Sequence, residues 1–210
     1  MSKQNLSDIL FNDDNDSFVC PFELFEEWYQ QAQEAETDYP NALTFATVDK
    51  EGMPDARILL MNGRDERGFV VYMNLESTKG QQLKNNPKAA ALFYWKALRR
   101  QVRIRGFVEQ VSDEEADAYF ATRPKGSRIG AHASKQSRPL DSRETLLNRT
   151  KELEKQYPDE FVPRPKNWSG YRIIPLEIEF WKDGKYRLHD RVLFKRENAN
   201  AVWQTIRLNP

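Results

Sequence analysis

Three basic side chains occupy alternate positions in the stretch YRLHDRVLF, residues 186–194: Arg187, His189 and Arg191. This histidine is one of only two in the chain. On a β-strand the three side chains would share one face, because successive residues point to opposite faces. They would repel one another unless an anionic or electron-rich ligand lay among them, although charges also occur on solvated strand edges, where they block unwanted pairing. Since histidine titrates near physiological pH, we favour a ligand site over a solvated edge.

A second basic cluster lies in the segment YFATRPKGSRIGAHASKQS, residues 119–137. Charged and neutral donors can together surround the oxygens of a phosphate, and the alternative is a flexible basic loop. A third group lies in ESTKG, at an expected helix start, where free N–H groups bind phosphates but an ordinary helix cap is the commoner role. The second cluster consists of Arg123, Lys125, Ser127, Arg128, Ser134, Lys135 and Ser137. The third group consists of Ser77, Thr78 and Lys79.

Other common chemistries lack the residues they need. His132 and His189 are far apart in the sequence and there is no cysteine pair, so we expect no metal site. The chain has no GxGxxG motif, no Walker A loop and no GxSxG nucleophile elbow. The single cysteine, Cys20, cannot form an intrachain disulfide, and its place near the N-terminus favours a structural role over a nucleophilic one.

The composition argues against several classes of partner. The 210 residues include 32 Lys and Arg and 32 Asp and Glu, so the net charge is zero. General nucleic-acid and membrane-surface binders usually have a basic excess, and we expect neither partner here. No apolar run approaches the roughly 18 residues of a transmembrane helix, and the N-terminus lacks the apolar core of a signal peptide. We therefore expect a cytoplasmic protein.

The elements that position these residues can be read from periodicity and turns. Residues 1–18 are polar and acidic and predict a flexible arm, and residues 19–210 predict a single domain. Asp183-Gly184 predicts a hairpin turn between two strands. About seven strands without regular βαβ alternation favour a mainly β, antiparallel barrel with peripheral helices. The expected helices are 21–36, 77–86, 112–123 and 141–157, and the strand-like runs are 42–49, 56–62, 69–74, 89–95, 100–111, 171–181, 186–194 and 201–208.

The motifs, in this order, resemble those of the pyridoxamine (pyridoxine) 5'-phosphate oxidase family, the FMN enzymes of vitamin B6 metabolism. The resemblance extends from about Pro21 to Pro210. Several quoted motifs carry it, of which the last two are especially specific: ARILL, YMNLESTKGQQLKNNP, RQVRIRG, YFATRPKGSRIGAHASKQS, IEFW and RLHDR.

The resemblance implies a homodimeric split β-barrel with FMN at the subunit interface. By motif match, the flavin would be lined by Arg57, Ile58, Leu59, Leu60, Tyr72, Met73, Thr78, Lys79, Gln101, Gln136, Ser137, Trp181 and Arg191. The substrate phosphate would be held by Tyr119, Arg123 and Ser127, with Asn62 nearby. Arg187 and His189 would be the catalytic pair facing the substrate's pyridine ring, with Leu188 between them.

The implied reaction is the oxidation of pyridoxamine 5'-phosphate or pyridoxine 5'-phosphate to pyridoxal 5'-phosphate. A hydride would leave the substrate's C4′ carbon for the flavin, and molecular oxygen would be reduced to hydrogen peroxide. The amine substrate would give an imine, which water would hydrolyse with release of ammonia. Arg187 stays protonated at any working pH, so it would position the substrate and stabilise charge rather than act as a base. His189 would either move a proton or orient the substrate.

Two positions depart from the family pattern. Asn62 stands where a phosphate-binding lysine is usual, and Thr78 where an arginine usually meets the FMN phosphate. Arg64 is a nearby residue that could replace the charge missing at Asn62. The alternatives are a phenazine-pathway type of flavin oxidase on the same scaffold, a non-catalytic flavin or pyridoxal-phosphate binding protein, and a barrel with a vestigial site. Retention of the phosphate residues argues against the first alternative, and retention of Arg187 and His189 against the second.

Overall fold

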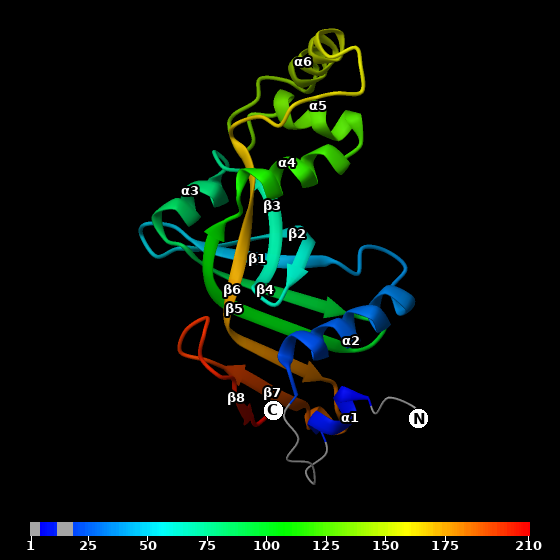
Figure 1. Cartoon of the computed structure of the whole chain (residues 1–210), viewed down its shortest axis with the longest axis vertical. Coiled ribbons are helices and arrows are strands. Elements are labelled where there is room, and N and C mark those ends of the chain that lie inside the picture. Colours follow the sequence, from blue (N-terminus) through cyan, green and yellow to red (C-terminus); the bar gives the residue numbers. More distant parts are fainter. Residues whose placement is uncertain (1–4, 12–18) are drawn as a thin grey trace.

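The barrel closes through one long strand that pairs with three others. The computed structural model describes residues 5–11 and 19–210 (Figure 1). The strands run in the order β3-β2-β1-β4-β5-β6, and β6 pairs again with β3, while β7 and β8 extend the sheet beyond β6. Every strand pair is antiparallel, as predicted. The strands are β1 (Ala42–Val48), β2 (Pro54–Asp65), β3 (Gly68–Asn74), β4 (Lys88–Trp95), β5 (Arg100–Gln110), β6 (Trp168–Lys182), β7 (Asp190–Lys195) and β8 (Gln204–Arg207).

Local signals in the sequence account for most of the helices. Pro21 opens α2, and serine side chains accept backbone N–H bonds at the starts of three others: Ser77 from Gly80 at 3.3 Å, Ser112 from Glu115 at 3.1 Å and Ser142 from Thr145 at 3.1 Å. Among the described residues, no helix is both long and apolar enough to cross a membrane. The helices are α1 (Leu6–Phe11), α2 (Pro21–Ala35), α3 (Thr78–Asn85), α4 (Asp113–Thr122), α5 (Lys125–Ala133) and α6 (Arg143–Gln156).

An aromatic cluster joins α2 to the barrel. Phe25 is fully buried, and its ring centroid lies 4.7 Å from that of Phe69 and 5.2 Å from that of Phe93. Trp95 lies 5.9 Å from the same ring. These rings come from α2, β3 and β4, so the helical period of α2 and the alternation of the strands converge on one core.

Helix α5 was not predicted, because its segment was interpreted as a basic phosphate-binding or flexible stretch. Gly126 and Gly130 lower the helix propensity of this stretch. The helix nevertheless forms, and Ile129 and Ala133, four residues apart, are buried on one of its faces. With α4 and α6 it lies at one end of the molecule, beyond the barrel strands (Figure 1).

The predicted strand over residues 186–194 is wrong in its first half. Residues 185–187 form a 3₁₀ turn, η1 (Lys185–Arg187), and β7 begins only at Asp190. Tyr186 and Arg187 adopt positive φ values of 58° and 66°, which no strand residue has. Only Arg191 of the three basic residues lies on a strand, so the shared face expected from alternation does not exist.

The predicted hairpin exists, but its loop is longer than an Asp-Gly turn. Lys182 pairs with Asp190, which leaves residues 183–189 between the strands. A Cβ at Gly184 would lie 1.9 Å from the carbonyl oxygen of Leu188, so the loop folds back tightly and this position requires glycine.

Part of the segment expected to be a flexible arm forms α1. Its Leu6 N–H donates to the Glu27 carboxylate at 2.8 Å, and the indole N–H of Trp28 donates to Ser7 Oγ at 3.2 Å. Leu10 is buried in the main core. The rest of the expected arm, residues 1–4 and 12–18, lies outside the described residues.

We predict that Phe25→Ala lowers the free energy of unfolding by about 3–5 kcal/mol, because it opens a cavity at the centre of the aromatic cluster. Urea unfolding of the flavin-free protein, at one fixed protein concentration, measures this change. Phe161→Ala is the control: that ring is 76% exposed, and we expect a change within about 0.5 kcal/mol. Equal losses in the two variants would contradict the assignment of Phe25 to the core.

Candidate functional site

A cavity of about 590 Å³ lies between the barrel and the end of the molecule that carries α4 and α5. Side chains of β2, β3, α3, α4, α5 and the start of β6 form its walls. A second cavity of about 420 Å³ shares Ile58, Leu59, Lys79 and Gln136 with the first. The structure thereby brings together fourteen of the residues predicted from the sequence: Arg57, Ile58, Leu59, Leu60, Asn62, Tyr72, Met73, Thr78, Lys79, Tyr119, Arg123, Ser127, Gln136 and Ser137.

The last turn of α4 presents an uncompensated positive charge to the larger cavity. Arg123 is the C-cap residue directly after this helix, and its Nη1 atom is buried without a hydrogen-bond partner among the described residues. Its guanidinium lies 4.8 Å from the Trp168 ring centroid. Burial lowers the pKa of Arg123, although the neighbouring Tyr119 opposes the shift. A buried guanidinium N–H without a partner is costly, so this position suits an anion.

Tyr119 and Ser127 add neutral donors to the same wall. Tyr119 stacks on Tyr72, with ring centroids 4.0 Å apart and planes within 16°. Burial raises the pKa of the Tyr119 hydroxyl, while Arg123 lowers it, and the net shift is upward. The hydroxyl therefore stays protonated at neutral pH and can donate. Ser127 lies in the first turn of α5, so one cation and two hydroxyls meet the requirement of a phosphate group.

Two further cations, Lys79 and Arg57, border the smaller cavity. Lys79 is buried, and its Nζ lies 3.3 Å from Gln136 Oε1 and 3.4 Å from Ser77 Oγ. Burial and then the charge of Arg57 lower the pKa of Lys79, and Asp55 partly opposes them. Arg57 is fixed by hydrogen bonds to Thr47 Oγ1 at 2.6 Å and to the Phe45 carbonyl at 3.1 Å, and it forms an ion pair with Asp55. This end of the cavity can therefore take a second anionic group.

An apolar wall joins the two cationic ends. Ile58 and Leu60 alternate on β2, and they are 65% and 37% exposed, unlike the apolar side chains of the core. Met73 and Tyr72 on β3 line the same cavity. An open wall of large apolar side chains between two cationic ends suits a flat aromatic ring system that carries phosphate.

Two residues change what the sequence suggested about this cavity. Trp168 was not predicted as a site residue, yet it lines the cavity and stacks on Tyr72 at 5.2 Å. The sequence feature that could have indicated this role is its position, because Trp168 is an aromatic residue where the proline-rich loop of residues 158–167 meets β6. Arg64 does not replace the charge missing at Asn62: it donates to Glu26 at 2.6 and 2.8 Å, lies over the Tyr29 ring at 4.3 Å, and is not among the lining residues.

The other predicted site residues form a separate group at the far end of β6. Gln101, Trp181 and Arg191 are neighbours across β5, β6 and β7, because Gln101 pairs with Trp181 and Trp181 with Arg191. Arg191 donates to Glu179 at 2.9 Å and to the Asn209 carbonyl at 2.9 Å. The His189 ring lies 4.7 Å from the Trp181 ring.

His189 is held by the tight loop that precedes β7. Its Nδ1 lies 3.2 Å from both the Gly184 nitrogen and Asp183 Oδ1. Arg187 and Leu188 of the same loop are exposed. Arg187, Leu188 and His189 are not among the residues that line the two cavities.

The two groups are too far apart to form one site within a chain. Trp168 of the first and Trp181 of the second lie thirteen residues apart on β6. At about 3.3 Å per residue, an extended strand of that length spans roughly 40 Å. Figure 1 shows the same separation, with α4 and α5 at one end of β6 and β7 at the other.

Comparisons with known proteins agree with this arrangement. Residues 29–157 match the family model described as pyridoxamine 5'-phosphate oxidase, and residues 168–210 match the pyridoxine 5'-phosphate oxidase C-terminal dimerisation region. A pyridoxine/pyridoxamine 5'-phosphate oxidase of Agrobacterium fabrum is 52% identical over 210 residues, which is 100% of both chains. Its counterpart in Azorhizobium caulinodans is 56% identical over 190 residues, 90% of each chain.

Solved structures share the fold. The structure of PhzG from Burkholderia lata, in complex with tetrahydrophenazine-1-carboxylic acid, has a TM-score of 0.88 and 32% identity, covering 97% of this chain and 98% of that one. A pyridoxamine 5'-phosphate oxidase-related, FMN-binding protein of Nostoc punctiforme has a TM-score of 0.74 and 20% identity, covering 92% and 100%. The family matches and the full-length relatives show that the chain belongs to the pyridoxine/pyridoxamine 5'-phosphate oxidase family.

Proposed function

We propose that this protein is an FMN-dependent oxidase that converts pyridoxamine 5'-phosphate or pyridoxine 5'-phosphate to pyridoxal 5'-phosphate, with molecular oxygen reduced to hydrogen peroxide. The observation that carries the proposal is the buried, unpartnered Nη1 of Arg123 beside Tyr119 in a cavity with an apolar wall. The names of the relatives that are more than 50% identical support the same reaction.

The residues of the two cavities fit FMN. Arg57, Lys79 and the N-terminus of α3 at Thr78 supply positive charge and free N–H groups for a phosphate, while Gln136 and Ser137 add polar contacts. The apolar wall on β2 and β3 would lie against the ring system. Bound FMN would accept the hydride from the substrate's C4′ and pass the electrons to oxygen.

The protein's own groups would hold and orient the substrate. Arg123, Tyr119 and Ser127 would bind its phosphate, with Asn62 as a further neutral donor. Arg187 would hold and orient the pyridine ring as a cationic hydrogen-bond donor. His189 would orient the ring or move a proton at the substrate, and Leu188 would pack beside it.

A second copy of the chain would complete each site. The loop of residues 183–189 lies roughly 40 Å along β6 from the phosphate end of the cavity. Trp181, Arg187, Leu188, His189 and Arg191 all fall in the region that matches the family's dimerisation region. We therefore propose a homodimer in which the loop of one chain closes the cavity of the other, with FMN between them.

The flavin absorption spectrum tests the central proposal. The purified protein should show flavin bands that bleach when pyridoxamine 5'-phosphate is added without oxygen, and the bands should return with oxygen. Bands that persist would favour a flavin oxidase with another substrate, the alternative that the likeness to PhzG supports. The buried charge of Arg123 favours a phosphorylated substrate over that alternative.

We predict that substitutions in residues 186–194 impair either turnover or FMN binding, depending on the residue. Arg187→Ala and His189→Ala should lower turnover with FMN still bound, because these residues would face the substrate. Arg191→Ala should weaken FMN binding, because Arg191 on β7 pairs with Trp181 on β6. The resemblance implies that both residues would lie against the flavin. Titration of the flavin-free protein with FMN, with assays at saturating FMN, separates the two effects. Loss of FMN binding by Arg187→Ala, with full activity on reconstitution, would show that the assignment is wrong.

Mixed dimers should show that the site is built from two chains. If Arg123 and Arg187 of one site come from different subunits, a dimer of one Arg123→Ala chain and one Arg187→Ala chain has one intact site and one site with both defects. Such heterodimers, purified through two different tags, should recover about half of the wild-type activity, whereas each variant homodimer stays low. If both residues of a site came from one chain, the heterodimer would have no intact site and no activity would return.

We expect Asn62→Lys to lower KM for the phosphorylated substrate several-fold and to change kcat little. Hydrogen bonds to charged groups contribute roughly 1.5–3 kcal/mol and neutral ones about 0.5–1.5 kcal/mol, so the added charge is worth on the order of 1 kcal/mol. A lower KM at constant kcat indicates added uniform binding. Absence of activity on both phosphorylated vitamers in wild type and variant, with FMN fully bound, would contradict the proposed reaction.

A further inference from the structure

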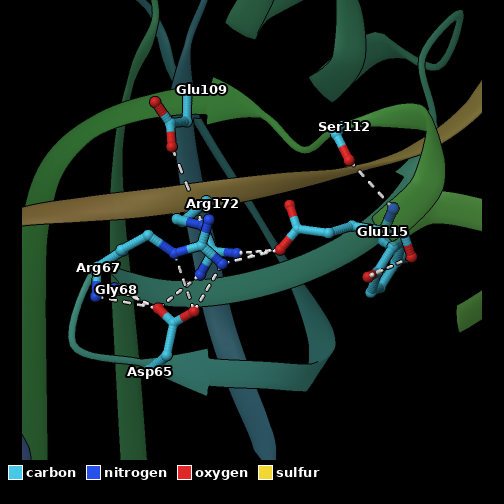
Figure 2. Close-up of polar contacts among 8 residues, drawn as sticks. Asp65, Arg67, Gly68, Glu109, Ser112, Glu115 and Arg172 are labelled. Atoms are coloured by element: carbon cyan, nitrogen blue, oxygen red, sulfur yellow. Dashed lines mark hydrogen bonds and ion pairs between the residues drawn. The ribbon is translucent and has the colours of Figure 1, made fainter. Parts of the chain in front are cut away.

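A network of charged side chains lies outside the cavity, beneath the start of α4. Arg172 of β6 is 3% exposed, and its guanidinium contacts Asp65 Oδ1 and Glu115 Oε1, each at 2.7 Å. Arg67 contacts the same two carboxylates, at 2.8 Å and 2.9 Å. Figure 2 shows the two arginines between the two carboxylates, with Glu109 on the other side of Arg172 at 3.9 Å. We refer to these five residues as the Arg172 network.

The network joins three separate parts of the fold. Asp65 ends β2 and Arg67 lies in the turn before β3, whereas Arg172 pairs with Val70 and Glu109 inside the sheet. Glu115 lies in the first turn of α4, where its backbone N–H also donates to the capping Ser112. The buried guanidinium of Arg172, together with that of Arg67, thus ties the β2–β3 turn to the first turn of α4.

The same helix carries the proposed phosphate-binding residues. Tyr119 and Arg123 follow Glu115 at intervals of four residues. Glu115 and Tyr119 therefore lie on one side of α4, and Arg123, the C-cap residue, continues the same side. Tyr72, on which Tyr119 stacks, donates its hydroxyl to the Glu115 carbonyl at 3.5 Å. Any shift of Glu115 is therefore passed to Tyr119 and Arg123.

Apolar contacts and ion pairs together hold α4 in place. Ala116 and Phe120 of this helix are buried, Phe120 packs against Trp168 and Tyr119 stacks on Tyr72. On another side, Arg164 donates to Asp117 at 2.6 Å and to Asp113 at 2.7 Å. The position of α4 therefore depends on these ring contacts and on the arginines that hold its first turns.

Asp65 and Glu115, the two carboxylates that contact both arginines, are charged at neutral pH. Burial raises the pKa of Glu115 and of Asp65, but hydrogen bonds from Arg67 and the charge of Arg172 outweigh burial and hold both pKa values below their ordinary ranges. The buried Arg172 therefore faces full negative charges, and in its absence the exposed Arg67 would be left as the arginine partner of both carboxylates.

We propose that Arg172 is a positioning residue for substrate binding: through Glu115 it sets the place of α4 and hence of Tyr119 and Arg123 around the substrate phosphate. This inference rests on the proposed phosphate site. Arg172 does not line the cavity, so it would act only through the helix. The phosphate, and not the pyridine ring, is the part of the ligand whose binding depends on it.

The test compares a ligand with and without phosphate. Pyridoxal 5'-phosphate and pyridoxal are titrated into the FMN-loaded protein, and KM and kcat are measured with pyridoxine 5'-phosphate. We expect Arg172→Met and Glu115→Gln to weaken pyridoxal 5'-phosphate binding and to raise KM by roughly three- to twentyfold, the range of typical long-range couplings. Pyridoxal binding and kcat should stay within about twofold.

Glu115→Gln keeps the size of the side chain and the Ser112 cap, so it tests the proposal even if Arg172→Met fails to fold. Arg172→Lys should recover only part of the effect, because a lysine cannot contact both carboxylates with a planar fork. Arg196→Met is the control for loss of a buried arginine: Arg196 is 9% exposed and bonds the Pro175 and Ala199 carbonyls, away from α4. We expect it to lower stability without changing the preference for the phosphorylated ligand.

Arg123→Ala in the same titrations separates this inference from the phosphate site. If Arg123→Ala leaves pyridoxal 5'-phosphate binding unchanged, the phosphate site is wrong. If Arg123→Ala weakens it but Glu115→Gln does not, or weakens both ligands equally, the positioning role is overturned. Glu115→Gln added to Arg123→Ala should then have little further effect, because the residue it positions is already gone.

Discussion

The triple pairing of β6 is the constraint on which the rest of the structure depends. Residues 168–173 of β6 pair with β3, residues 171–182 pair with β5, and residues 177–182 pair with β7. The strand can turn from one neighbour to the next because of a bulge where Arg105 and Gly106 face residues 175–177. A Cβ at Gly106 would lie 1.9 Å from the Ile174 carbonyl oxygen, so glycine is required at this close approach. Closure of the barrel and the distance between the two groups of site residues both follow from this one strand.

Several arginines pair with carboxylates, whereas Arg123 at the cavity has no such pair among the described residues. Arg64, Arg164, Arg172 and Arg191 each contact a carboxylate and fix one element to another. Arg123 instead packs against aromatic rings and keeps a buried N–H without a partner. The same side-chain type thus holds the fold where carboxylates surround it and offers a binding site where they do not. A net charge of zero conceals this distinction, which is why composition alone says nothing about the cavity.

Much of the fold can be predicted from the sequence because local signals agree with tertiary packing. Ser77 and Ser112 cap helices as expected, and Phe25 lies on the apolar side of an amphipathic helix. The failures have physical causes. The two glycines of α5 lower its helix propensity, so the helix was not predicted, although burial of Ile129 and Ala133 stabilises it. The left-handed residues after Gly184 interrupt a strand that was predicted from regular alternation.

The residues that line the two cavities could be predicted as a set, but their arrangement could not. Basic clusters indicated anion binding, and the motifs supplied fourteen residues that the structure gathers in two cavities with shared walls. Alternation wrongly placed Arg187 and His189 on one strand face with Arg191. Trp168 had no signal beyond its residue type, because its role arises from stacking on Tyr72, nearly one hundred residues earlier in the chain. The separation of the two groups also escapes sequence reasoning, since it depends on which residues β6 pairs with at each end.

The loop before β7 and the wall of the cavity both expose large apolar side chains. Tyr186 and Leu188 are 92% and 70% exposed, although both are large and apolar, and Arg187 between them adopts a left-handed conformation that costs free energy. Ile58, on the cavity wall, is 65% exposed. A large apolar side chain in water is ordinary on its own, but here such side chains lie beside Arg187 in the loop and on the cavity wall formed by β2. A two-fold arrangement would cover both surfaces at once, because in such an interface each chain gives its loop and receives the other's. In the homodimer proposed above, this loop would present Arg187 to the cavity of the second chain.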